Sequence, residues 1–391
     1  MNYDFDRIIT RKGHGDLKYD VVEERWGRDD LLPLWVADMD FETPDFILNA
    51  LRKQLEHPVL GYSKVPDKLW PTVIQWVKDH HQWDIRREWL CYIPGIVKGI
   101  GFVLNCFTQP GDKVIIQPPV YHPFRLVPEC NRREVVFNPL IRHEDGHYEM
   151  DFDQLEQACD SQCKVLILSN PHNPAGICWP KETLKRLAHF CHSRGILVIS
   201  DEIHCDMALF GHQHIPFATV SEEARQCSIT FQAPTKTFNI AGVVSSYAIV
   251  PDDKLRNKFY RWMEASEFEA PNIFAPTATI AAFSQGEEWR KQMLRYIEKN
   301  YEFVNDYCLK HMPSVQPLRP QASFLVWLDC RNLNLSHEQL LDLFIDKAHL
   351  ALNDGEMFGP GGEGFMRLNI ASPRSILEQA MRQLAEAIAR L

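Results

Sequence analysis

The sequence predicts an α/β protein in which a mostly parallel sheet lies between helices and a smaller α/β block follows. Short runs rich in Val and Ile, such as 113–117 and 164–169, alternate with amphipathic segments in the middle of the chain. These runs show no polar alternation, which is typical of strands covered by helices on both faces. The 391 residues also exceed what one hydrophobic core usually spans, so we expect two domains.

The individual elements follow from the same patterns. Between two of the expected strands, residues 181–192 carry apolar side chains at helical spacing, which indicates a βαβ unit. Strands of the large domain are expected at 113–117, 164–169, 195–200, 228–231 and 245–250. The C-terminal block is expected to contain a helix over 286–312, strands at 322–328 and 364–370, a helix near 336–348 and a final helix through Leu391.

Three segments follow from these elements. Residues 1–45 hold too little regular pattern for a domain, and we expect them to pack on the small domain and on a partner subunit. Residues 46–285 should form the large domain, and residues 286–391 the small one.

Composition narrows the class of protein. The chain is 45% hydrophobic and 24% charged, as soluble globular proteins are. Its formal net charge of −10 argues against nucleic-acid and anionic-membrane partners. Residues 1–7 do not resemble a signal peptide, and no apolar run approaches the roughly 18 residues of a membrane helix. We therefore expect a cytoplasmic protein.

Cysteines and histidines do not suggest a metal site. The 11 cysteines are scattered and form no CxxC pair, so reduced thiols of a cytoplasmic protein are expected. Among the 16 histidines, the closest clusters are His80 with His81 and His212 with His214. Neither cluster has a carboxylate or cysteine partner at ligand spacing, so no metal is expected.

Four polar features directly follow expected strands, where open α/β sheets bind ligands. The first is the turn from Ile93 to Gly99, whose glycines and free N–H groups could bind an anion or could simply form a turn. The second is the Asn-Pro pair around Asn173, which either aims an amide over the sheet or only ends the strand.

The other two features carry charge. Asp201 ends an apolar strand, and a buried carboxylate there needs a cationic partner such as a protonated ring nitrogen. Lys236 lies in an apolar, aromatic stretch that could lower its pKa and favour imine chemistry, although most lysines are solvated surface groups.

The order and spacing of these four features resemble those of the fold-type I pyridoxal-phosphate enzymes, the aspartate aminotransferase superfamily. The features lie about 75, 30 and 35 residues apart, and the resemblance covers nearly the whole chain. It implies pyridoxal 5′-phosphate as cofactor, a seven-stranded mostly parallel sheet in the large domain and a smaller α/β C-terminal domain.

The resemblance also implies roles for single residues. Lys236 would hold the cofactor as a Schiff base and move the substrate proton, and Asp201 would pair with the pyridinium nitrogen. Tyr121 would stack on the ring, and these three residues would be the catalytic ones. Asn173 would bind the phenolic oxygen and border the substrate, and His204 stands where many relatives carry Tyr in the same role.

Further positions match the phosphate and the substrate carboxylate. The backbone groups of Ile96 and Val97 would bind the phosphate. Arg367 would bind the substrate α-carboxylate with its planar fork. Relatives often have a hydroxyl residue where this chain has Ala233, and Thr235 or a partner residue could compensate.

The N-terminal part resembles the MalY/PatB branch, which includes cystathionine β-lyases and cystalysin. The segments Trp35 to Phe41 and Leu60 to Lys64 carry this likeness. It implies that Ala37 lines the substrate carboxylate pocket. It also implies that Tyr62 reaches the phosphate in the neighbouring subunit of a homodimer with shared active sites. Relatives often have a second Tyr where this chain has His122.

The branch favours a carbon–sulfur β-lyase that acts on cystathionine- or cysteine-type amino acids and releases pyruvate, ammonia and a thiol. An aminotransferase is the alternative because both reactions share every residue named above. A regulatory binding protein that retains the cofactor is a second alternative. The sequence shows no obvious second arginine for a side-chain carboxylate.

Overall fold

The Val- and Ile-rich runs form one seven-stranded sheet in the computed structural model, which describes residues 3–391. Met1 and Asn2 of the expected N-terminal segment lie outside the described residues. Only β10 runs antiparallel to its neighbours, so the expected mostly parallel sheet is confirmed. In spatial order the strands are β2 (Leu90–Ile93), β10 (Ser246–Ile249), β9 (Ser228–Gln232), β8 (Leu197–Asp201), β7 (Cys163–Ser169), β3 (Lys113–Ile116) and β4 (Glu134–Phe137).

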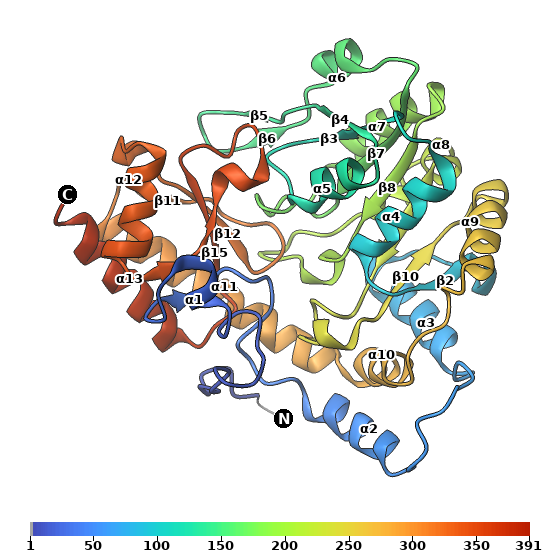
Figure 1. The fold of residues 1–391 in the computed structure, drawn as a ribbon, viewed down its shortest axis with the longest axis horizontal. Helices are drawn as coiled ribbons and strands as arrows, with labels where there is room; N and C mark the ends of the chain where they lie inside the picture. The colour runs from blue at the N-terminus through green and yellow to red at the C-terminus, as the bar shows by residue number, and fades with distance from the viewer. Residues whose placement is uncertain (1–2) are drawn as a thin grey trace.

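Helices cover both faces of this sheet (Figure 1). Along β7, Val165 and Ile167 face one core and Leu166 and Leu168 face the other, as a strand buried on both sides requires. The first face packs on α4 (Ile96–Phe107), α5 (Pro123–Cys130) and α9 (Asp253–Ala265). The other packs on α7 (Lys181–Ser193), α8 (Glu222–Gln226), α3 (Leu69–His81), α6 (Phe152–Ala158) and α10 (Phe274–Gln285).

One edge of the sheet collects the strand ends that carry the polar features. Ser169 of β7 lies beside Asp201 of β8 in register, and β9 ends on the same side. Because β10 is antiparallel, its first residue, Ser246, pairs with Ile93, the last residue of β2. Loops from five strands therefore meet at this edge.

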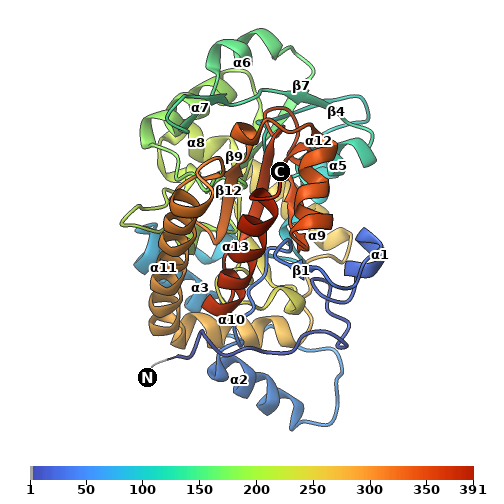
Figure 2. The ribbon, with the colours of Figure 1, turned by 90° about the vertical axis from the view of Figure 1, so that its left-hand side faces the viewer.

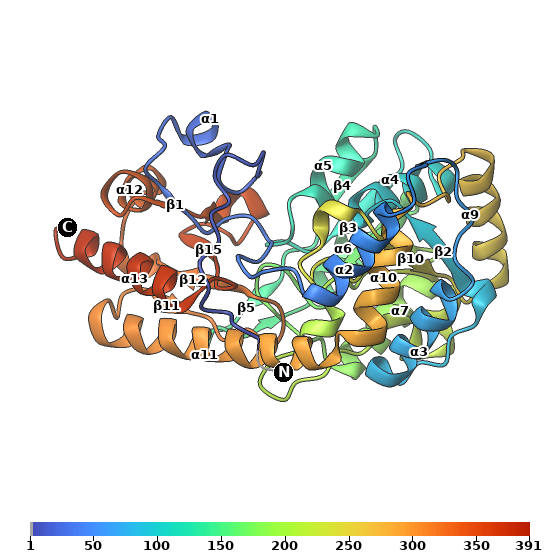
Figure 3. The same ribbon diagram turned by 90° about the horizontal axis from the view of Figure 1, so that it is seen from below.

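A second lobe is built on a four-stranded antiparallel sheet (Figures 1 and 2). The long helix α11 (Glu287–His311) packs against α13 and runs from this lobe to α10, as Figure 3 shows. The strands in spatial order are β11 (Gln316–Pro317), β12 (Leu325–Asp329), β15 (Phe365–Asn369) and β14 (Asn353–Asp354). The other helices are α12 (His337–Asp342), the π-helical turn η6 (Leu343–Lys347) and α13 (Arg374–Ile388).

Two boundaries in this lobe differ from the sequence expectation. The strand expected from residue 322 begins only at Leu325, because the N–H groups of Gln321 and Ala322 bond to Gly176 O instead of a strand. Ser323 has a φ of 77°, which is incompatible with a regular strand. The helix expected over 336–348 changes to π-helical geometry after Asp342.

The N-terminal segment lies on the small lobe in all three views (Figures 1–3). Its strand β1 (Leu32–Pro33) pairs with β13 (Leu350–Ala351), and its helix α1 (Val22–Trp26) lies beside this pair. The side chain of Asn369 donates to the carbonyls of Val36 and Asp38 at 2.7 and 2.6 Å. These contacts agree with the expected packing, and the three-part division at residues 45 and 285 stays a prediction. After this segment, α2 (Asp45–Leu55) packs on α10.

Among residues 3–391, no helix combines the length and the apolar character needed to cross a bilayer.

Candidate active site

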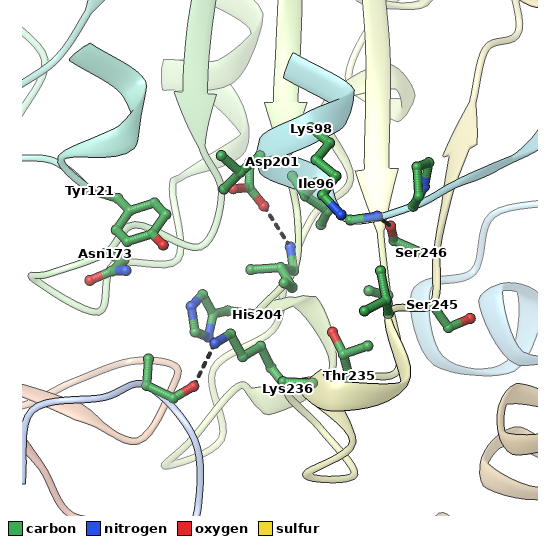
Figure 4. A pocket seen from close by; sticks show the side chains of 18 of the residues that line it. Ile96, Lys98, Tyr121, Asn173, Asp201, His204, Thr235, Lys236, Ser245 and Ser246 are labelled. Carbon is green, nitrogen blue, oxygen red and sulfur yellow. Dashed lines mark hydrogen bonds between the residues drawn. The ribbon is translucent and has the colours of Figure 1, made fainter. Parts of the chain in front are cut away.

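A cavity of about 310 Å³ lies at the strand-end edge of the large sheet. It brings together residues that are far apart in the sequence and that the sequence analysis selected: Ala37, Ile96, Val97, Tyr121, Asn173, Asp201, His204 and Lys236. In Figure 4, Tyr121 and Asn173 lie at one side of the cavity, and Ile96, Lys98 and Ser246 lie at the opposite side. The cavity is therefore elongated between an aromatic end and a helix start.

The helix start offers free backbone donors. Gly95 has a φ of 105°, a conformation that favours glycine, and it turns the chain from β2 into α4. The first backbone bond of the helix joins Gly99 N to Gly95 O at 2.9 Å, so Ile96 and Val97 keep free N–H groups within the described chain. Hydroxyl groups of Thr235, Ser245 and Ser246 line the same end. Free N–H groups, the helix dipole and hydroxyls together suit a phosphate.

Asp201 lies in this cavity wall as a buried carboxylate that no cation neutralises. Its only hydrogen bond within residues 3–391 comes from Ile203 N at 3.1 Å. Burial raises the pKa of Asp201 to about 7, and the nearby Lys236 opposes this only in part. A protonated ring nitrogen in the cavity would supply the missing partner.

Lys236 enters the cavity from the loop after β9. Its amine donates to the carbonyl of Ala37, which belongs to the N-terminal segment (Figure 4). Burial lowers the pKa of Lys236 to about 8. An amine with this pKa is neutral often enough to act as a nucleophile or a base near physiological pH.

Arg367 on β15 is buried and has no carboxylate partner among the described residues. Its guanidinium donates to Asn173 Oδ1 at 3.0 Å, to the carbonyl of Trp35 at 3.0 Å and to Asn353 Oδ1 at 2.6 Å. Its Nε has no partner, and burial lowers the Arg367 pKa to about 10. A buried guanidinium held only by neutral groups is prepared to bind an anion.

Neutral polar groups complete this end of the cavity. Asn173 accepts from Arg367 with Oδ1, which leaves its Nδ2 without a partner in the described chain. The Nδ1 atom of His204 is buried without a partner, and burial lowers the His204 pKa to about 3. The phenol pKa of Tyr121 is raised, mainly by burial, so Tyr121 and His204 are both uncharged near neutral pH.

A second, outer cavity of about 990 Å³ shares Ala37, Tyr121, Lys236 and Ala241 with the inner one. The N-terminal segment forms much of its wall, and Arg367 and His122 also line it. Because the two cavities share these four residues, the outer one gives access from the surface to Lys236.

Two residues considered in the sequence analysis, Tyr62 and Ala233, add no polar side chain to either cavity of this chain. Tyr62 lies outside both cavities of its own chain and is fully exposed in the irregular segment between α2 and α3. Ala233 lines the inner cavity and offers no hydroxyl there. Ser245 and Ser246, which the sequence analysis missed, supply hydroxyls at that end, and the only available signal was their position at a strand start.

The structure also corrects the expectation that the histidine clusters lack acidic partners. His81 Nε2 lies 3.0 Å from Asp206 Oδ1, and His214 Nε2 lies 2.9 Å from Glu202 Oε2. Asp206 is 125 residues from His81, so local spacing could not reveal that pair, whereas Glu202 is only 12 residues before His214. Asp206 also accepts from Trp76 Nε1 at 3.0 Å, and His81, Asp206 and Cys205 form a compact buried group.

Comparison with known proteins identifies the family. The family model described as aminotransferase class I and II matches residues 29–388, and the chain belongs to this family. The chain is 40% identical to cystathionine β-lyase PatB of Bacillus subtilis, over 98% of this chain and 99% of that protein. It is 32% identical to protein MalY of Escherichia coli, over 99% of each chain.

A solved structure agrees with these sequence matches. Cystalysin from Treponema denticola, whose crystal structure contains a pyridoxal 5′-phosphate cofactor, superposes with a TM-score of 0.95 at 32% identity. The match covers 100% of both chains. The predictions of the fold-type I family and of the MalY/PatB branch are thereby confirmed.

Proposed function

We propose that this chain is a pyridoxal 5′-phosphate-dependent carbon–sulfur β-lyase that cleaves cystathionine- or cysteine-type amino acids to pyruvate, ammonia and a thiol. The proposal rests on two buried charged groups without ionic partners, which line the two connected cavities. Asp201 is a buried anion without a cation, and Arg367 is a buried cation without an anion. A cofactor with a protonated ring and a substrate with a carboxylate would satisfy them both.

The residues of the inner cavity fit the cofactor along its length. The N–H groups of Ile96 and Val97 and the hydroxyl of Thr235 would hold the phosphate, since the Ser246 hydroxyl already donates to the carbonyl of Ile93. Tyr121 would pack against the ring, and Asp201 would hold the ring nitrogen protonated. Asn173 Nδ2 would donate to the phenolic oxygen, and His204 lies on the same wall.

Arg367 would orient the substrate. Its fork, held by Asn173, Asn353 and the carbonyl of Trp35, would bind the α-carboxylate and so fix the position of Cα relative to Lys236. The backbone of Ala37 would border the same carboxylate, since its carbonyl already contacts Lys236.

Lys236 would carry the proton. When bound, the cofactor stabilises negative charge that develops at the substrate Cα. The Nζ atom of Lys236, whose pKa is lowered to about 8, would accept the Cα proton. A thiolate or thioether on the β-carbon can then leave.

The lyase is favoured over the aminotransferase by the relatives that match the whole length of the chain. PatB is described as a cystathionine β-lyase, and its alignment includes the N-terminal segment that lines the outer cavity. The family name keeps amino transfer as the second candidate, because the same cavity residues would serve both reactions.

We also propose a homodimer in the cytoplasm. Val59, Leu60 and Tyr62 are exposed apolar side chains on one irregular segment, which a second copy would cover. Tyr62 would then reach the phosphate end of the partner's cavity. All 11 cysteines are free, which suits a reducing compartment.

One assay separates the two reactions. Purified protein with cofactor is given cystathionine or cysteine, first without and then with a keto acid. Pyruvate release without a keto acid supports the lyase. A strict requirement for the keto acid would refute it in favour of amino transfer, and a protein that binds no cofactor would refute both.

A further inference from the structure

The outer cavity holds more positive charge than its own acidic residues neutralise. Four carboxylates line it, and each one is paired with a basic residue. Arg11 binds three of them, and Arg7 binds the fourth, Glu42. The three carboxylates on Arg11 are Asp16, Asp38 and Asp40.

Two other arginines in this wall lack an anionic partner. Arg367 is held by neutral groups alone, as described above. Arg25, in the last turn of α1, has no side-chain hydrogen bond and no carboxylate within 4.0 Å in residues 3–391. Its guanidinium lies over the rings of Trp35 and Trp26, at 4.5 and 5.1 Å from their centroids. Stacking fixes the position of Arg25 while its N–H groups stay free.

Trp35 contacts both of these arginines. Its carbonyl accepts from Arg367 at 3.0 Å, and its indole ring carries Arg25. The two guanidinium groups therefore lie against the same residue, one at its carbonyl and the other over its ring. A ligand with a carboxylate at each end of a short chain could contact both.

His122 lies within the electrostatic influence of both arginines. Burial, together with the positive charges of Arg367 and Arg25, lowers the pKa of His122 to about 4. Its Nδ1 atom is buried without a hydrogen-bond partner, and the ring lines the outer cavity. A neutral imidazole with an unused nitrogen therefore faces the space that such a ligand would cross.

We propose that Arg25 binds a second, distal carboxylate of the substrate and thereby selects thioether amino acids that carry a carboxylate at both ends, such as cystathionine. Arg367 binds the α-carboxylate at Lys236, and Arg25 binds the carboxylate of the departing half. The sequence alone shows no obvious second arginine for such a group. The inference rests on the proposed lyase function.

The test compares two substrates in Arg25→Gln holoenzyme. Cystathionine carries the distal carboxylate, whereas S-methylcysteine has the same scissile bond without it. Losing one charge-assisted contact at an accessible position should raise the KM for cystathionine about tenfold. The kcat for cystathionine and both constants for S-methylcysteine should stay unchanged.

Arg125→Gln is the matched control. Arg125 also lowers the His122 pKa and also lacks an ion pair within the described chain, but it lines neither the inner nor the outer cavity. It should leave both substrates unaffected. Equal KM increases for both substrates in Arg25→Gln, or no increase for cystathionine, would overturn the proposal.

A binding measurement tests the role of Arg25 without depending on lyase activity. Calorimetry on the holoenzyme compares an unreactive straight-chain dicarboxylate with the monocarboxylate of equal length. The dicarboxylate should bind more tightly to the wild type, and Arg25→Gln should remove the difference. If neither thioether releases pyruvate but the wild type prefers the dicarboxylate, the lyase proposal is refuted and carboxylate binding by Arg25 is supported. If the wild type shows no such preference, carboxylate binding by Arg25 is refuted.

Discussion

Replacing the Asp201 carboxylate should have a favourable effect in the apoenzyme and an unfavourable one in the holoenzyme. This carboxylate is fully buried, accepts only one backbone hydrogen bond and has no basic group within 4.0 Å in the described chain, and the more distant charge of Lys236 offsets the effect of burial only in part. Asp201→Asn keeps the shape and removes the charge. In the apoenzyme the substitution should stabilise the fold, and in the holoenzyme it should weaken cofactor binding because the ring nitrogen loses its anion.

The magnitude follows from the pKa of Asp201. Burial raises this pKa from 3.8 to about 7, which corresponds to about 4 kcal/mol. The folded pKa lies above the unfolded one, so the folded state binds the proton more tightly. Ionised Asp201 therefore destabilises the apoenzyme as pH rises from about 4, and the full penalty is present above about pH 7.

The assay is denaturation of apoenzyme by urea across this pH range, with wild type and variant side by side. The gain in unfolding free energy from Asp201→Asn should be small at about pH 4 and approach about 4 kcal/mol above about pH 7. Glu202 provides the control because it is the next residue, is equally buried and has the opposite pKa shift. Its carboxylate contacts His214, Gln232 and the N–H of Phe217, and these contacts hold its pKa below the usual value.

Glu202→Gln should consequently destabilise the fold, by about 3–5 kcal/mol, since it breaks a buried pair. The reasoning about Asp201 would be refuted by an Asp201→Asn apoenzyme that is less stable than wild type above pH 7. It would also be refuted by a stabilisation that does not change with pH, because only ionisation makes Asp201 unfavourable.

Three other predictions concern the cavity. Lys236→Ala should remove the visible absorption of a lysine Schiff base, and an unchanged spectrum would assign the link to another lysine. Because the Lys236 pKa is lowered to about 8, covalent attachment of the cofactor to apoenzyme should accelerate with pH up to about 8 and then level off. Stopped-flow absorbance measures this rate, and acceleration continuing to about pH 10 would indicate an ordinary lysine. Arg367→Lys should raise the KM for amino acids about ten- to a hundredfold with little change in cofactor affinity. Equal losses of both affinities would contradict its assignment to the substrate.

The sequence pattern was sufficient for five strands of the large sheet and for polar residues at its strand ends, whereas β2 and β4 were covered only by the seven-stranded sheet that the family resemblance implies. An apolar run ends at each of Ser169, Asp201 and Ile93. A parallel sheet brings the ends of such runs to one edge, independently of the conformation of the loops. The strand at 322–328 was misplaced because tertiary contacts override propensity there. Gly176 O takes the N–H groups of Gln321 and Ala322 that a strand would have used.

The same reasoning explains why Arg367 could be predicted and Arg25 could not. Arg367 lies in a strand, and the motif around it is local. Its hydrogen-bond partners come from other parts of the chain: Trp35 is 332 residues away in the sequence, and Asn353 lies on the neighbouring strand. Arg25 lies on a five-residue helix with no motif, and only the packing of the N-terminal segment on the small lobe places it in the cavity wall. Cofactor residues are fixed by the sheet, whereas substrate selection depends on a segment whose position only the folded chain defines. Relatives with the same strand-end residues could therefore differ in substrate through this segment alone.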